Sequence, residues 1–286
     1  IQVFTKRGEG PALIEAFGGA GNFGTTQLGA GVSGSSGAWS YALRAAEYET
    51  HGVSARKGPH PAQQAWHDYN PGLDADRDGL RSRSVGGNLG YTVAPGHELR
   101  VNLLRIESRN WYDGGGFNAV GGADVGNDLV TEVIAVESLN RVTDNWRSTL
   151  RLAQSKDEST GFRGVSRFNS KQQQFLWQND VQLPLGTLML GYEHLEQSAD
   201  STTTYTVKSR DISSLMAGWN ATLGNHLLQA NLRHDNNSQF GDKLTHLLGY
   251  GYRITPALRA NASIGTSFKA PTLNDLYYID SAGNHG

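Results

Sequence analysis

The strongest constraint on the fold is a period of two in hydrophobicity, which is clearest in two runs, 244–254 and 258–268. Each run has about ten residues, and a three-residue turn containing Pro256 joins them. Five apolar residues of the first run fall on even positions: Leu244, Leu248, Tyr250, Tyr252 and Ile254. A period of two places apolar side chains on one face of a β-strand and polar side chains on the other. Ten residues also suit a tilted strand that crosses a bilayer, so the hairpin indicates an antiparallel membrane β-barrel.

The same alternation recurs along the chain, and its connections alternate in length. Short connections are expected near Pro95, Asn140, Pro184, Gly224 and Pro256, with long polar segments between them. In an up-and-down meander, every second connection lies at the same end of the sheet. The pattern therefore predicts tight turns at one end and large loops at the other, as in outer-membrane barrels. About thirteen strands follow Pro11, whereas bacterial barrels have an even number, so we expect an all-β, up-and-down transmembrane barrel that is partial and not closed.

Composition agrees with this fold class and excludes several functions. Hydrophobic residues make up only 37% of the 286 residues, as expected if only alternate residues face lipid. The net charge of −2 provides no basic field for nucleic acid, and the absence of cysteine excludes disulfides and thiolate metal sites. Charged and polar residues opposite the apolar ones should face a wet or protein-filled lumen; they include Arg44, Arg100, Arg147, Arg151, Gln178, Asp180, Gln182, Asn231, Arg253 and Arg259.

Two short motifs carry little functional weight. Gly19, Gly21 and Gly24 match the spacing of a dinucleotide-binding fingerprint, but no helical pattern follows, so a Gly-rich hairpin turn is expected. His234 and Asp235 are adjacent, which we interpret as a polar pair at a loop tip rather than a catalytic dyad. The chain contains no metalloprotease or nucleophile-elbow motif, and we expect no enzyme activity.

The densest group of carboxylates is Asp74-Ala-Asp76-Arg-Asp78-Gly79. Hard oxygen ligands on one tight turn suit Ca²⁺, although Val85 at the twelfth position excludes a complete EF-hand. Three neighbouring carboxylates repel one another unless a cation neutralises them. The residues leave two interpretations open: a calcium site, or a solvated loop with arginine partners. The candidate partners are Arg77, Arg81 and Arg83.

Three segments resemble the TonB-dependent receptors. IQVFTKRG at 1–8 resembles the junction where the plug domain ends and the barrel begins. HDNNSQFGDK at 234–243 and IGTSFKAPTLNDLY at 264–277 resemble a mid-barrel signature of that family. The resemblance implies a 22-stranded barrel with a plugged lumen. Residues 1–10 would then be the end of the plug and the plug–barrel junction, and 11–286 the N-terminal part of the barrel.

Within this family the chain is most similar to the vitamin B12 transporters. The resemblance implies a receptor in the outer membrane of a Gram-negative bacterium that binds and imports cobalamin. A TonB–ExbB–ExbD complex would supply energy through the plug. The alternatives are a receptor for an iron–siderophore or another metal chelate, a passive porin, and a soluble β-sandwich binding module.

The resemblance also implies calcium sites in two neighbouring extracellular loops, where Ca²⁺ orders the loops that hold the substrate. Asp76 and Asp78 match the first loop, where Asp74 replaces a usual Gln. Tyr112 and Asp113 match a pair in the second loop, and the final ligand falls on Asp124 by spacing or on Asp128 by its place before the next strand. Thr202, Thr203 and Thr204 resemble a loop that touches cobalamin, with a polar loop tip as the alternative.

Overall fold

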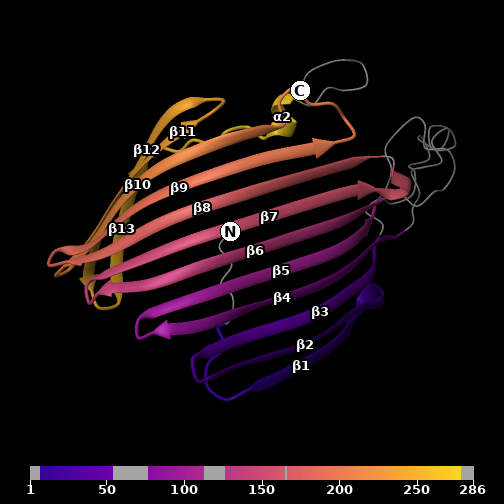
Figure 1. Cartoon of the computed structure of the whole chain (residues 1–286), viewed down its shortest axis with the longest axis horizontal. Helices are drawn as coiled ribbons and strands as arrows, with labels where there is room; N and C mark the ends of the chain where they lie inside the picture. The colour runs from indigo at the N-terminus through magenta and orange to yellow at the C-terminus, as the bar shows by residue number, and fades with distance from the viewer. Residues whose placement is uncertain (1–6, 54–76, 113–125, 165, 278–286) are drawn as a thin grey trace.

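The computed structural model describes residues 7–53, 77–112, 126–164 and 166–277. They form one sheet of thirteen antiparallel strands, in which each strand pairs with its neighbours in sequence (Figure 1). The strands are β1 Leu13–Gly21, β2 Thr25–Ser36, β3 Trp39–Val53, β4 Asp78–Ala94, β5 His97–Trp111, β6 Gly126–Thr143, β7 Trp146–Gly161, β8 Arg167–Leu183, β9 Gly186–Ser201, β10 Ser209–Leu223, β11 His226–Asn237, β12 Gly241–Thr255 and β13 Leu258–Gly265. Short helices η1 (Asn22–Gly24), η3 (Phe162–Gly164) and α2 (Leu273–Tyr277) lie between or after strands. Among the described residues, no helix has the length and apolar character to cross a bilayer.

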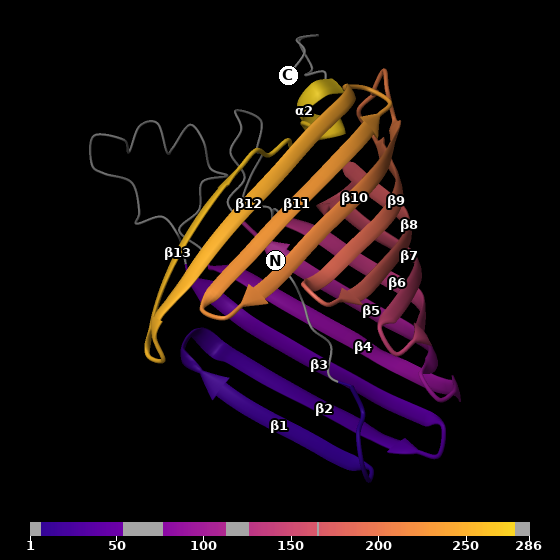
Figure 2. The same ribbon diagram turned by 90° about the vertical axis from the view of Figure 1, so that its left-hand side faces the viewer.

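The sheet curls into an open trough (Figure 2). The two edge strands are β1, which pairs with β2, and β13, which pairs with β12. The predicted up-and-down barrel with about thirteen strands and no closure is therefore confirmed.

The shortest connections all lie at one end of the sheet, as predicted, although two connections at the other end, 22–24 and 238–240, have only three residues. Two residues join the strands at one end, which we call the turn end, in the connections 37–38, 95–96, 144–145, 184–185, 224–225 and 256–257. The opposite end, called the loop end, carries the other connections. The Gly-rich segment at 22–24 is a tight hairpin connection there, and not the start of a long helix.

The strands extend further toward the loop end than the alternation predicts. The polar sequence of residues 234–243 predicts a long loop, but β11 continues to Asn237 and β12 starts at Gly241. Residues 156–170 likewise belong mostly to β7 and β8. Beyond the apolar band both faces of a strand are polar, so the period of two disappears although the backbone pairing continues.

The hydrophobic alternation changes phase at Leu104, which predicts a β-bulge, but the strand pairing has none at this position. The pairing of Leu104 with Gly86 is continuous with its neighbours, and the register shifts between β4 and β5 beside the turn, between Thr92 and Ala94. Leu104 lies on the mostly polar face, where Gly86 has no side chain and leaves room for it: a Cβ on Gly86 would stand 3.2 Å from Leu104 Cδ1. The break in alternation reflects local packing rather than a change of register.

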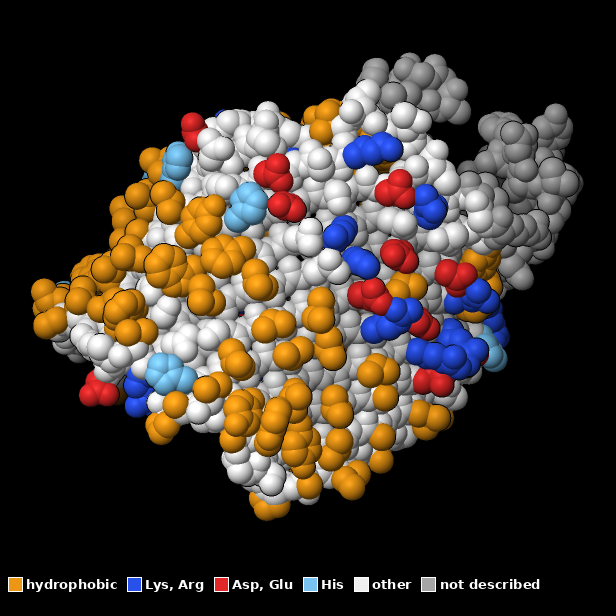
Figure 3. Space-filling model, viewed as in Figure 1, with side chains coloured by type: hydrophobic (Ala, Val, Ile, Leu, Met, Phe, Trp, Pro, Cys, Tyr) orange, Lys and Arg blue, Asp and Glu red, His pale blue; other side chains and the backbone are white. Residues whose placement is uncertain are grey.

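One face of the sheet is apolar, and we call it the outer face. Figure 3 shows hydrophobic side chains over much of it, with charged side chains gathered toward one end of the strands. Aromatic residues lie next to the turn end, where the rings of Trp39 and Tyr91 are 4.6 Å apart and Trp219 Nε1 donates to the carbonyl of Leu185 at 3.1 Å. This arrangement is that of an aromatic girdle at a membrane interface.

The opposite, inner face is polar and carries paired charges. Glu137 is only 6% exposed, and Arg151 Nη2 lies 2.6 Å from its carboxylate. Arg100 Nη1 lies 3.8 Å from the same carboxylate, and Asn102 donates to it at 3.2 Å. The buried hydrophobic residues of the described chain are few and scattered: Ala42, Ala199, Tyr205, Ala221 and Leu273. Without a dry middle layer, the fold is not a soluble β-sandwich.

Candidate functional site

A cavity of about 580 Å³ lies on the inner face at the loop end, and we call it the rim chamber. The ends of β7, β8, β9 and β10 form its wall, the 202–208 connection forms one side, and the segment leading into α2 crosses it. Most of the residues that line it have polar side chains: Ser155, Asp157, Ser159, Ser166, Arg167, Phe168, Ser170, Lys171, Gln172, Gln197, Ser198, Ala199, Ser201, Thr202, Thr203, Tyr205, Arg210, Thr272, Leu273 and Asn274. Many hydroxyl and amide groups around an open cavity can hydrogen-bond a polar ligand.

The predicted threonines lie in the connection beside this chamber. Thr202 and Thr203 line it, whereas Thr204 does not. Thr202 and Arg167 exchange two hydrogen bonds: the Thr202 amide donates to the Arg167 carbonyl at 3.0 Å, and the Arg167 amide donates to Thr202 Oγ1 at 3.2 Å. These bonds hold the start of the connection against β8, so the two threonines present a fixed polar edge.

Tyr205 is the residue of this connection that the sequence did not single out. Its side chain is 4% exposed, its ring lies 6.3 Å from that of Phe168, and its hydroxyl donates to Asn274 Oδ1 at 2.5 Å. The last bond joins residues 69 positions apart. Only the three-dimensional course of the chain after β13 brings these two side chains together.

Arg210 is the second residue of the chamber that the sequence pattern did not indicate. It is 8% exposed and lies on the inner face of β10. Its Nε donates to Gln197 Oε1 and its Nη1 donates to the Pro271 carbonyl, both at 2.6 Å. Both acceptors are neutral, so these hydrogen bonds satisfy donors without cancelling the charge. A guanidinium of this kind can bind an anionic group in the chamber.

The segment that crosses the chamber is fixed by a capping box at the start of α2. The Thr272 amide donates to Asp275 Oδ2 at 2.9 Å, and the Asp275 amide donates to Thr272 Oγ1 at 3.1 Å. The amide and the hydroxyl of Thr272 lower the pKa of the Asp275 carboxyl below its ordinary value. Leu273 in the first turn of the helix is buried, at 7% exposure, and anchors it.

The predicted calcium ligands are only partly within the described residues. Asp74, Asp76, Asp113 and Asp124 lie outside them. Asp78 is the first residue of β4 and pairs with Val53, and Tyr112 follows the last residue of β5 with 47% exposure.

Asp128 has a partner in the sheet. It is the third residue of β6, and both of its carboxylate oxygens accept from Arg109, at 2.7 and 2.9 Å. Arg81 and Arg83, suggested as partners for the aspartates, both donate to Glu47 Oε1. The cross-strand register explains this choice, because Glu47 lies opposite Arg83 and next to Arg81.

His234 and Asp235 lie within β11, not at a loop tip. His234 Nε2 is 3.4 Å from Asp242, whereas Asp235 pairs with Arg233 at 2.7 Å. Successive residues of a strand point to opposite faces, so the two side chains cannot act as a dyad.

Comparison with known proteins agrees with this architecture. Residues 16–285 match the family "TonB dependent receptor-like, beta-barrel". A vitamin B12 transporter, BtuB, of Photobacterium profundum is 28% identical over 287 residues, covering 98% of this chain and 44% of the relative. BtuB of Vibrio vulnificus is 29% identical over 220 residues, covering 73% of this chain and 35% of that protein.

Among solved structures, a mutant of the ferric enterobactin receptor PfeA of Pseudomonas aeruginosa is similar, with a TM-score of 0.74 and 19% identity over 95% of this chain and 46% of that one. The siderophore receptor PirA of Acinetobacter baumannii has a TM-score of 0.70 and 14% identity, over 97% of this chain and 45% of its own. At these identities the structures share the fold. The chain spans less than half the length of these relatives.

Proposed function

Because the chain belongs to the TonB-dependent receptor-like β-barrel family, we propose that it is part of the wall of an outer-membrane receptor that binds cobalamin in the rim chamber and imports it. The supporting observation is the place of that chamber: it opens on the polar inner face, at the end of the sheet that carries the loops. In an outer-membrane barrel this end faces the outside of the cell. A ligand captured there would stand at the entrance of the lumen.

The favoured substrate follows from the relatives and from the chemistry of the chamber. The two sequence relatives described above are named vitamin B12 transporters. Cobalamin is large, rich in amides and carries one phosphate diester. The hydroxyl and amide groups around Thr202 and Gln197 suit the amides, and the uncancelled charge of Arg210 suits the phosphate.

An anionic metal chelate is the second candidate. The same cationic side chain, Arg210, would bind the charged groups of a ferric siderophore. The similar solved structures are named as receptors for such ligands, although the likeness at under 20% identity concerns the fold. A passive porin is disfavoured because the segment crossing the chamber is anchored at Leu273 and by the Tyr205–Asn274 bond.

The proposed receptor also binds Ca²⁺, through residues of the two segments that flank β4 and β5. We assign Asp74, Asp76 and Asp78 to the first segment, and Tyr112 and Asp113 to the second, with Asp124 as the closing ligand. Asp128 is the weaker choice for that position because Arg109 already occupies its carboxylate. On binding, Ca²⁺ would order these loops above the lumen.

Energy coupling would act through a plug domain upstream of the barrel. The contact of Arg7 with Glu98, at 2.9 Å, supports a junction that runs along the inner face near the turn end. The TonB–ExbB–ExbD complex would pull on that domain from the periplasmic side. Outer-membrane lipid would contact the apolar outer face.

Calorimetric titration of the full-length receptor tests the proposal, with cyanocobalamin and ferric enterobactin as ligands, each with Ca²⁺ and with a chelator. Binding of cyanocobalamin that Ca²⁺ strengthens supports the first candidate, and binding of the siderophore alone supports the second. Arg210→Met should lower the affinity for the ligand that binds by about tenfold or more, because a hydrogen bond to a charged group contributes about 1.5–3 kcal/mol. Arg253→Met, a matched change on the inner face near the turn end, should leave affinity unchanged. Failure of both ligands to bind would refute the proposal.

A further inference from the structure

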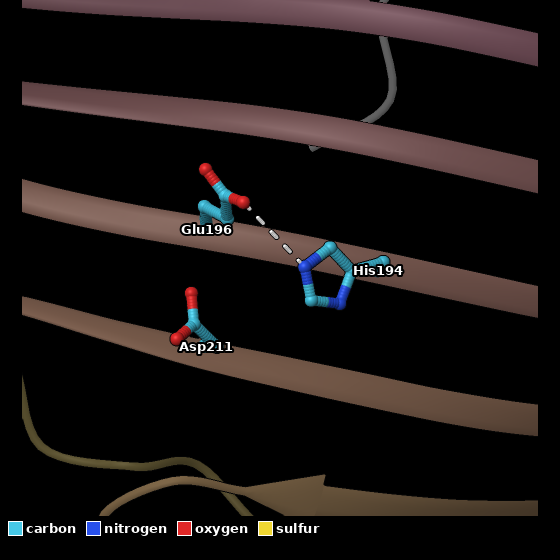
Figure 4. A group of neighbouring side chains, drawn as sticks. All are labelled: His194, Glu196 and Asp211. Atoms are coloured by element: carbon cyan, nitrogen blue, oxygen red, sulfur yellow. Dashed lines mark ion pairs between the residues drawn. The ribbon is translucent and has the colours of Figure 1, made fainter.

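A cluster of three possible metal ligands lies on the outer face of β9 and β10, away from the rim chamber. His194 and Glu196 are two residues apart on β9, and Asp211 lies directly opposite Glu196 on β10. Figure 4 shows the three side chains on the two neighbouring strands. Their ligand atoms, one from each residue, all lie within 4.8 Å of one another. Gln197 and Arg210, the next residues along each strand, point to the other face and line the chamber.

The imidazole of His194 is oriented by Ser213, and its other nitrogen points toward Glu196. Its Nδ1 is 3.0 Å from Ser213 Oγ on β10, and its Nε2 is 3.6 Å from Glu196 Oε1. Metal-binding histidines commonly have one ring nitrogen in a hydrogen bond that orients the ring and fixes the tautomer. Ligand atoms about 2.0–2.2 Å from a tetrahedral metal are about 3.3–3.6 Å apart, so the His194–Glu196 distance already fits.

The cluster carries two carboxylates whose mutual repulsion a bound cation would relieve. Glu196 and Asp211 are like charges directly opposite each other on adjacent strands, a destabilising arrangement. Other carboxylates of the outer face are neutralised by arginine, as in the pairs Arg81–Glu47, Arg105–Glu132, Arg109–Asp128 and Arg167–Asp200. Among the described residues, neither Glu196 nor Asp211 forms an ion pair with Lys or Arg. A metal ion would replace this repulsion with two attractive contacts.

We propose that His194, Glu196 and Asp211 bind a divalent transition-metal ion on the outer wall of the barrel. One imidazole nitrogen and two carboxylate oxygens suit Zn²⁺ and its first-row neighbours better than Ca²⁺, which prefers oxygen ligands alone. Three protein ligands leave a fourth position for water. Its ligands differ from those proposed for calcium in the segments next to β4 and β5.

The bound metal would link β9 and β10, the two strands that form one side of the chamber. We call this cross-link the metal clip. Glu196 lies five positions before the end of β9, and Asp211 is the third residue of β10, so the metal closes the strand pair just below the 202–208 connection. This connection holds Thr202, Thr203 and Tyr205. Binding should therefore reduce local opening of the connection, a consequence that rests on the structure and not on the identity of the substrate.

The test is calorimetric titration of the full-length receptor, stripped with EDTA and in detergent, with Zn²⁺ as the probe. Wild type should bind one Zn²⁺. Glu196→Gln and His194→Ala should each lower the affinity for Zn²⁺ at least tenfold. Ser213→Ala should weaken it by about 10-fold, the lower end of the effect of removing an outer-shell partner. His234→Ala is the matched control, since His234 pairs with a single carboxylate on the same face at 3.4 Å and should not affect binding.

Hydrogen exchange provides a second readout that is independent of substrate. Amides of residues 202–208 should exchange more slowly in wild type with Zn²⁺ than without it, and Glu196→Gln should abolish the difference. The inference is refuted if Zn²⁺ binding is unchanged in Glu196→Gln and His194→Ala, or if wild type binds no Zn²⁺. Cyanocobalamin binding without any Zn²⁺ site would refute the metal clip and leave the proposed uptake function intact.

Discussion

The hydrogen bond between Tyr205 and Asn274 allows a sharp test of how the rim chamber is closed. Tyr205→Phe removes one oxygen atom and keeps the ring that packs near Phe168. Tyr205 is 4% exposed whereas Asn274 is exposed, so the change removes one hydrogen bond but water can still reach Asn274 Oδ1. The net loss of such a bond is about 0.5–1.5 kcal/mol. A loss of this size makes local opening about 2–10 times more frequent.

Hydrogen exchange of the α2 amides in the full-length receptor measures this opening. The Leu276 amide, which donates to the Thr272 carbonyl at 3.2 Å, should exchange faster in Tyr205→Phe by that factor. Asn274→Ala should have a similar effect, and the double variant should add little, because both changes remove the same bond. Fully additive effects of the two single changes, or unaltered exchange in Tyr205→Phe, would refute the account.

Two further predictions concern the capping box and the outer face. Thr272 lowers the pKa of Asp275 below 3.8, so the contribution of the carboxylate to α2 is complete above that pH and is lost as pH falls through the lowered value. Exchange of α2 amides should therefore accelerate below about pH 4 in wild type, whereas Asp275→Asn should remove this pH dependence. Leu152, 61% exposed on the outer face, should face lipid, so Leu152→Arg should lower the free energy of unfolding in lipid vesicles by about 2–4 kcal/mol. Gln174→Arg, on the inner face beside Glu193, should cost little, and equal costs for the two changes would contradict the assignment of faces.

The architecture could be predicted from sequence because its signals are local. A period of two specifies a strand with one apolar face, and Pro95, Pro184 and Pro256 mark turns at one end of the sheet. The pattern failed where both faces of a strand are polar, which is why the 234–243 segment was expected to be a long loop. The backbone pairing there is real, but no hydrophobic signal accompanies it.

The site was less predictable, because its parts are joined over long distances in sequence. Thr202 and Thr203 could be found because the 202–204 segment resembles a known loop, whereas Arg210 and Tyr205 gave no such signal. Their importance depends on the segment around Pro271 and Asn274, which lies more than sixty residues downstream. The pairing of Arg109 with Asp128 likewise follows from strand register, which the sequence alone does not determine.

Because side chains alternate between the two faces, neighbouring residues of one strand serve different sites: one lines the rim chamber and the next belongs to the proposed metal site. On β9, Gln197 faces the rim chamber and Glu196 faces outward; on β10, Arg210 faces the chamber and Asp211 faces outward. The backbone between them is shared, and each pair of strands is held by continuous hydrogen bonds, so a metal that fixes the outer side chains also limits the motion of the inner ones. Coupling between Zn²⁺ and substrate would then arise from the reduced mobility of one strand pair and would need no change of shape. It should vanish in Asp211→Asn, which leaves every chamber residue in place.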